Sequence, residues 1–211
     1  MGNAISRRRI IIALAALGLL AVLAFAGIVL SDLFRSDAPL CAAASAQPAP
    51  APTPTPESGG PRVVVYKSRR QLILFRDGME PKSYRITLGT EPDGDKERRG
   101  DCRTPLGTFY VCEKNQKSKF YLFVAISYPN EEDAARGLEH GLITRAQHDA
   151  IARAIAAHKT PPWHTRLGGE IGIHGGGTAW DWTQGCVAVD NADMRELYAE
   201  IPIGAEVTIE P

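Results

Sequence analysis

Short runs of β-branched and aromatic residues, separated by polar turns, dominate the chain from residue 62 onward. Such runs favour strands, and a turn such as Asp77-Gly78 favours antiparallel neighbours. The first three runs therefore predict an antiparallel meander, and two more follow further along. The predicted strands are residues 62–66, 71–75, 83–88, 107–112 and 120–126. Residues 89–103 are glycine-rich and charged without periodicity, which predicts an exposed loop.

Two helix starts follow these strands. Asn130 precedes three acidic residues, which suit the positive end of a helix dipole. Thr144 is followed by Gln147 at the spacing of a capping box. Beyond Thr144, apolar residues recur at helical spacing and predict a packed face made of Ala146, Ala150, Ile151, Ala154 and Ile155.

The last third of the chain predicts strands at residues 167–173, 186–189 and 206–210, with a loop over 175–185 and a helix over 191–200. Strands and helices do not alternate, and no internal repeat occurs. The predicted fold is mostly β (α+β) with two or three helices, and a doubly wound nucleotide-binding fold is disfavoured.

The N-terminal pattern is different. Arg7-Arg8-Arg9 precedes an uncharged run, residues 10–30, about as long as a helix needs to cross a membrane. We expect residues 1–9 to stay in the cytoplasm and residues 10–30 to form a transmembrane signal anchor. The alternative is a cleaved signal peptide, since Ala24-Phe25-Ala26 and Ala44-Ser45-Ala46 offer small-residue cleavage sites.

Residues 31–61 are rich in alanine and proline, with proline alternating through APAPTPTP. Proline removes backbone donors and favours extended conformations, so this segment predicts a stiff linker. The anchor would then hold one domain, residues 62–211, away from the membrane on its outer side.

Charge and cysteine content narrow the functional classes. Lysine plus arginine total 24 and aspartate plus glutamate total 24, so nothing predicts a nucleic-acid partner. The four cysteines and the three histidines at 140, 148 and 158 show no metal-ligand spacing. A disulfide between Cys102 and Cys112 is conceivable only if the chain turns between them, as Pro105 and Gly107 would allow.

One pair of residues can do chemistry. A glycine-rich loop separates His174 from Cys186, so an imidazole and a thiol can meet across it. A free thiol is only a few per cent thiolate at neutral pH, so a cysteine nucleophile needs such a base. Gly185 leaves neighbouring backbone amides uncovered, as the donors of an oxyanion hole require.

Residues 173–194, IHGGGTAWDWTQGCVAVDNADM, resemble the signature of the L,D-transpeptidase catalytic domain, the YkuD-like family of peptidoglycan enzymes. That signature runs His-Gly, a variable loop, Ser or Thr, one residue and Gly-Cys. Residues 103–110, RTPLGTFY, resemble a second family segment, and the likeness spans about residues 62–210. The resemblance implies a β-sandwich with short helices and no cofactor or metal.

Carried over to this chain, the family pattern makes Cys186 the nucleophile and His174 the proton acceptor and later donor. Gly175 would orient the imidazole through its carbonyl. The remaining motif positions, which include the oxyanion hole, are Thr183, Gln184 and Gly185. Within the loop, three residues either line the groove for the stem peptide or pin the loop down: Trp180, Asp181 and Trp182.

The implied reaction is attack of the thiolate on the tetrapeptide stem, release of D-alanine, and transfer of the acyl group to an amine. The amine is a second stem, a D-amino acid or a lipoprotein lysine. Gln184 and Ala188 depart from the histidine and arginine that the family often carries there. A hydrolase on the same scaffold and a non-catalytic wall-binding module therefore remain open alternatives. The resemblance places the domain in the periplasm, tethered to a bacterial inner membrane by a single pass.

Overall fold

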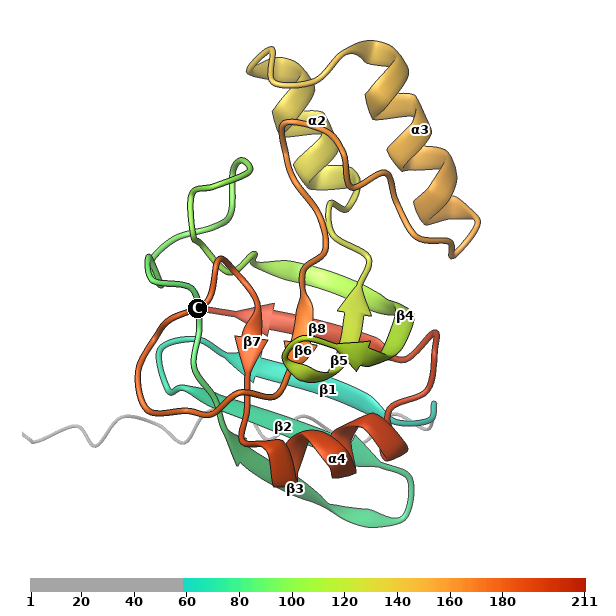
Figure 1. Ribbon diagram of the computed structural model, residues 1–211. Helices are drawn as coiled ribbons and strands as arrows, with labels where there is room; N and C mark the ends of the chain where they lie inside the picture. Colours follow the sequence, from blue (N-terminus) through green and yellow to red (C-terminus); the bar gives the residue numbers. More distant parts are fainter. Residues whose placement is uncertain (1–58) are drawn as a thin grey trace, which may run out of the picture. The chain divides into compact units, whose positions relative to one another are not determined.

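The computed structural model describes residues 59–211, so the predicted anchor and most of the predicted linker lie outside the described residues. Eight strands form one sheet in the order β3-β2-β1-β8-β4-β5-β6-β7 (Figure 1). Within residues 59–211, no helix is long and apolar enough to span a bilayer. The strands are β1 (Arg62–Tyr66), β2 (Gln71–Arg76), β3 (Met79–Arg85), β4 (Gly107–Ser118), β5 (Tyr121–Ile126), β6 (Gly172–His174), β7 (Val187–Ala188) and β8 (Glu206–Glu210).

The predicted meander of the first three strands is confirmed, since β1 pairs antiparallel with β2 and β2 with β3. Gly78 turns the chain between β2 and β3 with φ of 68°, a conformation that costs glycine little. The third strand begins at Met79, earlier than the apolar run alone predicts, because the hairpin extends pairing through polar, exposed residues.

The mostly β fold is confirmed, but the strands form one curled sheet in place of the two stacked sheets of a sandwich. The cause lies in β4, whose first residues pair with β8 and whose later residues pair with β5. The change of partner falls between Tyr110 and Val111, and a register shift between Val111 and Glu113 follows at once in the pairing with β5. A bulge bends a strand and increases its twist, so β4 links both halves of the sheet.

Both predicted helix starts are confirmed. In α2 (Glu131–Glu139), Asn130 and Asp133 form a capping box. In α3 (Arg145–Ala156), Thr144 and Gln147 do the same. The two helices lie side by side, away from the main sheet, at the top of Figure 1. They enclose a small apolar cluster, which Leu167 joins from a later loop.

The predicted apolar face of α3 is confirmed only in part. Ile151 is fully buried, but Ala146 is exposed. Ile151 is the one buried residue of α3, and Ile155 packs partly buried against the same cluster. The main core belongs to the sheet and to α4 (Asn191–Glu200), whose Met194 and Leu197 are fully buried.

Two predicted strands are shorter than expected. The 167–173 stretch becomes a strand only at residues 172–174, because Gly168 and Glu170 have φ of 92° and 56° and cannot extend a strand. The 186–189 stretch forms a strand only over Val187–Ala188. The helix at residues 191–200 and the strand at residues 206–210 are confirmed.

Candidate active site

The pairing of β6 with β7 brings the two candidate reactive residues together. These strands run parallel, with Ile173 opposite Val187 and His174 opposite Ala188. Side chains two residues apart share a face, so Cys186 lies on the same face as Ala188 and therefore as His174. Both His174 and Cys186 line a cavity of about 560 Å³.

His174 is buried and held in one orientation. Its Nδ1 lies 2.5 Å from the carbonyl oxygen of Gly175, and only 1% of the residue is exposed. A carbonyl oxygen can only accept, so Nδ1 carries the proton and Nε2 keeps its lone pair. Burial lowers the pKa of His174, and the hydrogen bond to Gly175 opposes that effect only in part. The imidazole is therefore a neutral base at neutral pH.

Aromatic rings account for this burial. The ring of Phe120 stacks on the imidazole with centroids 4.6 Å apart. Trp182 meets the imidazole edge-on at 5.5 Å, and Phe123 lies at 6.4 Å. Apolar rings exclude water from the imidazole and disfavour its charged form.

The glycines next to His174 leave no room for a side chain. A Cβ at Gly175 would lie 2.3 Å from the Asn191 side-chain oxygen, which accepts a hydrogen bond from the Gly176 amide at 2.9 Å. At Gly176 a Cβ would approach Trp182 to 2.8 Å. The backbone after β6 thus packs directly against Asn191 of α4 and against the ring of Trp182.

Cys186 is a thiol at rest. Burial raises its pKa to about 11, although a backbone contact from Gly172 and the charge of Lys96 act in the opposite direction. The Sγ atom donates to the carbonyl oxygen of Glu170 at 3.6 Å. Within residues 59–211 the thiol shares no hydrogen bond with the imidazole. The hydrogen bond to Glu170 must therefore break before the thiol proton can pass to His174.

The segment before Cys186 forms a tight hydrogen-bonded turn. The Thr183 hydroxyl donates to the Cys186 carbonyl at 2.7 Å and accepts from the Gly185 amide at 3.1 Å. The Gly185 amide, at a position that the motif assigns to the oxyanion hole, is thus already engaged. Gln184 itself is exposed and lines the cavity.

The loop residues expected at the substrate groove separate into two kinds. Trp182 lines the cavity, whereas Trp180 and Asp181 do not. Trp180 is 68% exposed. Asp181 pairs with Arg70 at 2.7 Å and accepts from the Leu88 amide at 2.9 Å, so it pins the loop to the meander.

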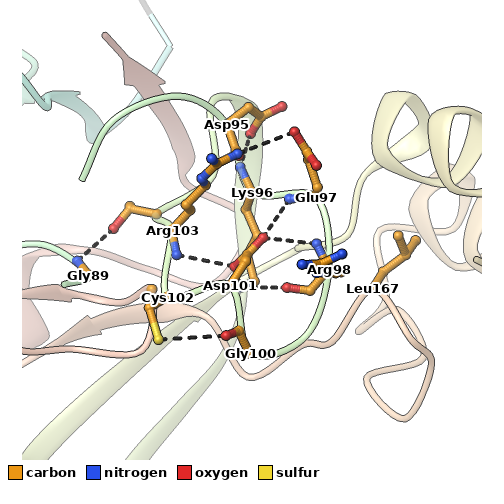
Figure 2. A network of polar contacts seen from close by, with 12 residues as sticks. Gly89, Asp95, Lys96, Glu97, Arg98, Gly100, Asp101, Cys102, Arg103 and Leu167 are labelled. Atoms are coloured by element: carbon orange, nitrogen blue, oxygen red, sulfur yellow. Dashed lines mark hydrogen bonds and ion pairs between the residues drawn. The ribbon is translucent and has the colours of Figure 1, made fainter. Parts of the chain in front are cut away.

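The loop at residues 89–103 is not simply exposed, as its composition predicted, because part of it folds around a buried ion pair (Figure 2). Lys96 is 2% exposed, and its Nζ lies 2.6 Å from Asp101. Asp101 also accepts from the amides of Glu97, Arg98 and Arg103. These hydrogen bonds outweigh burial and hold the pKa of Asp101 below its usual range.

Three further residues line the cavity. From the sequence, Trp163 and His164 after Pro161-Pro162 either extend the pocket or form a turn before a strand, and the structure places both in the cavity lining. The pattern of apolar residues places Phe120 only at the start of a strand, yet it also lines the cavity. Trp163 packs on Gly169, where a Cβ would lie 2.2 Å from the indole. The cationic residues that line the cavity are Lys96, Arg99 and Lys119. For the ordered part of the loop at residues 89–103, the one signal in the sequence is the pair Gly100-Asp101, because glycine next to aspartate is typical of ordered turns.

Cysteine and metal chemistry elsewhere are limited in the described part of the chain. Cys102, Cys112 and Cys186 are free thiols, so Cys102 and Cys112 are not joined. Across residues 59–211, no cluster of three or more histidine, cysteine, aspartate or glutamate residues could hold a metal ion.

Comparison with known proteins gives a family match. The model of the L,D-transpeptidase catalytic domain (YkuD) matches residues 60–209. No curated protein matches the sequence.

Among solved structures, an L,D-transpeptidase from Xylanimonas cellulosilytica is 20% identical with a TM-score of 0.44, over 75% of this chain and 64% of that one. The helical cell shape determining protein Pgp2 from Campylobacter jejuni is 23% identical with a TM-score of 0.48, over 72% and 47% respectively. This chain therefore matches less than two thirds of either protein.

Proposed function

Because this chain belongs to the L,D-transpeptidase catalytic domain family, we propose that it is a peptidoglycan L,D-transpeptidase with Cys186 as its nucleophile. One observation carries the proposal. A neutral, oriented imidazole and a thiol line the same cavity on the same face of neighbouring strands. This is the arrangement that nucleophilic catalysis by cysteine requires.

In the first step, the thiol proton passes to Nε2 of His174 while Sγ attacks a carbonyl carbon of the tetrapeptide stem. That carbonyl belongs to the amide between the third residue and the terminal D-alanine. The high pKa of the Cys186 thiol and the low pKa of His174 disfavour a separated ion pair at rest. Proton transfer therefore accompanies the attack.

In the second step, the tetrahedral intermediate collapses. Its oxyanion would be held by backbone amides of Gln184 and Cys186, since the Gly185 amide is bonded to Thr183. The imidazolium gives its proton to the leaving nitrogen, the C–N bond breaks and D-alanine departs. The carbonyl oxygen of Gly175 accepts from Nδ1 throughout and keeps the ring in place.

In the third step, His174 removes a proton from an acceptor amine, which attacks the thioester and frees the Cys186 thiol. Water in place of the amine would make the same scaffold a carboxypeptidase. Each step transfers one proton through His174, so no other acid or base is needed. The acceptor reaches the thioester through the opening lined by Gln184, which is exposed.

We also propose that the domain acts in the bacterial periplasm, facing the cell wall. The uncharged run at residues 10–30 would anchor it in the inner membrane, and residues 31–61 would extend it toward its substrate.

The test is to incubate the full chain with tetrapeptide-containing muropeptides beside its Cys186→Ala variant and to analyse the products by mass spectrometry. Cross-linked dimers and free D-alanine that depend on Cys186 would support the transpeptidase. Tripeptide monomers with free D-alanine would indicate the hydrolase. Unchanged substrate would overturn the enzymatic proposal in favour of a wall-binding module.

A further inference from the structure

Lys96 is a buried charge that the proposed mechanism does not use. Only 2% of the residue is exposed, and it lines the same cavity as Cys186. Burying an ammonium group is costly unless it is paired and hydrogen-bonded. A loop could have been stabilised by an apolar side chain at this position, so the buried charge calls for a reason.

The pairing of Lys96 leaves one of its donors unused. Its Nζ donates to Asp101 at 2.6 Å and to the carbonyl oxygen of Arg98 at 3.2 Å (Figure 2). An ammonium group has three donors. Within residues 59–211 the third has no hydrogen-bond acceptor, and Lys96 lines the cavity.

Asp101 bonds to the loop backbone as well as to Lys96. Its two oxygens also accept from the amides of Glu97, Arg98 and Arg103. This network fixes the position of Lys96. Of the two charges of the pair, that of Lys96 is the one that acts on the Cys186 thiol.

Other charged or titratable groups also line the cavity around Cys186. They are Glu170 and His174 from the segment up to the end of β6, His164 from the loop before it, Arg99 from the same loop as Lys96, and Lys119 from the β4–β5 turn. Among them, Glu170 opposes ionisation of the thiol, whereas Lys96 favours it. Of the three cationic side chains Lys96, Arg99 and Lys119, only Lys96 is buried.

We propose that Lys96 is a positioning residue for the reaction: its charge, fixed by Asp101, stabilises negative charge on Cys186 Sγ as the thiol gives up its proton. The inference rests on Cys186 being the nucleophile of the proposed function. Lys96 takes no proton and forms no bond. It acts through Sγ, on the negative charge that develops on the sulfur as its proton passes to His174 during the attack.

The experiment measures alkylation of Cys186 by iodoacetamide in the full chain between pH 7 and 10, with the Cys186 peptide quantified by mass spectrometry. Loss of one nearby positive charge should raise the thiol pKa by about one unit. The tenfold smaller thiolate fraction is partly offset because a more basic thiolate is about threefold more reactive. We expect Lys96→Met to alkylate about threefold more slowly.

Three variants separate charge from loop stability. Lys96→Gln provides a second neutral side chain in case Lys96→Met does not fold. Lys96→Arg should restore the alkylation rate, because it keeps the charge. Asp101→Asn removes the negative charge of the pair and should lower the melting temperature as Lys96→Met does. Its amide oxygen can still accept from Lys96 and hold it in place, so the positive charge stays near Cys186 and alkylation should not slow.

Equal slowing in Lys96→Gln and Asp101→Asn would overturn the proposal, because loop loosening would then explain both. An unchanged rate in both neutral variants of Lys96 would also overturn it. Alkylation reads the thiol directly and needs no peptidoglycan substrate. Failure of this inference is therefore distinguishable from failure of the proposed function, which would appear as a wild-type protein that leaves muropeptides unchanged.

Discussion

The ring of Phe120 stacks on the imidazole of His174 with centroids 4.6 Å apart and planes inclined by 20°. The contact joins the β4–β5 turn to the end of β6, and it covers the imidazole on one side. Together with Trp182 it keeps the proposed base out of water. Phe120 is therefore expected to set the proton affinity of His174 without touching the reacting atoms.

Replacing this ring should alter the pH dependence of the reaction. In Phe120→Ala, water reaches the imidazole and the lowered pKa of His174 returns toward its usual value of about 6.5. The acid limb of kcat/KM for D-alanine release, which reports the neutral base, should move to higher pH. Phe75→Ala is the control, since Phe75 is also half-buried but packs under Arg62 outside the cavity. An acid limb that moves equally in both variants would refute the role of the stack.

The raised pKa of Cys186 leads to a prediction of how its alkylation rate depends on pH. Because burial raises the pKa of Cys186 to about 11, the thiolate fraction should keep rising through pH 10. Iodoacetamide should therefore label the Cys186 peptide with no plateau between pH 7 and 10. A plateau below pH 8 would reveal a preformed thiolate–imidazolium pair and contradict the neutral resting state.

Gly185 should tolerate no side chain. Its φ is 127°, and a Cβ there would lie 2.6 Å from the carbonyl oxygen of Arg103. Gly185→Ala should destabilise the fold by about 2–3 kcal/mol and reduce D-alanine release at least tenfold, because the turn before Cys186 must shift. Urea denaturation and the release assay check the two effects.

Gly204→Ala is the matched control for Gly185. Gly204 has φ of 89°, but a Cβ at this position would meet no atom within 4 Å. The Gly204→Ala variant should lose only about 1 kcal/mol of unfolding free energy through backbone strain, and it should keep full activity. Equal losses in both variants would show that backbone conformation alone, and not the contact with Arg103, makes glycine necessary at residue 185.

Lys67 should contribute strongly to stability. Its buried Nζ donates to the carbonyl oxygens of Gly94 at 2.5 Å and Thr104 at 2.7 Å, so it ties the loop at residues 89–103, and the residue that follows it, to the end of β1. Lys67→Met should cost about 2–3 kcal/mol, since two acceptors, one of them fully buried, lose a charged donor. Lys82→Met should cost less than about 1 kcal/mol, because Lys82 and Glu196 pair at the surface. Similar denaturation midpoints for the two variants would contradict the stabilising role of the two Lys67 hydrogen bonds.

The features that sequence predicted well are local ones. The capping boxes at Asn130 and Thr144 each depend on residues three apart, and both form as expected. His174 and Cys186 are separated by a single loop, so the motif that contains them already implies their proximity. Within such short spans, residue type nearly determines the backbone path.

The features that sequence missed depend on distant contacts. The loop that carries Lys96 is placed by Lys67, and Trp163 is placed by Gly169 and by Arg99, which donates to its carbonyl oxygen. Nothing in residues 89–103 alone indicates which of their charges will be buried. The order of strands is likewise non-local, and for this reason one curled sheet could not be distinguished from a sandwich.

The position of β8 has a consequence for how the domain assembles. β8 lies between β1 and β4, parallel to the first and antiparallel to the second. The two halves of the sheet therefore cannot join until residues 206–210 have arrived, and the contacts that unite them span nearly the whole domain. Contacts of such high sequence separation slow folding. A chain still being synthesised on the ribosome would therefore hold the two halves of the sheet apart until β8 became available.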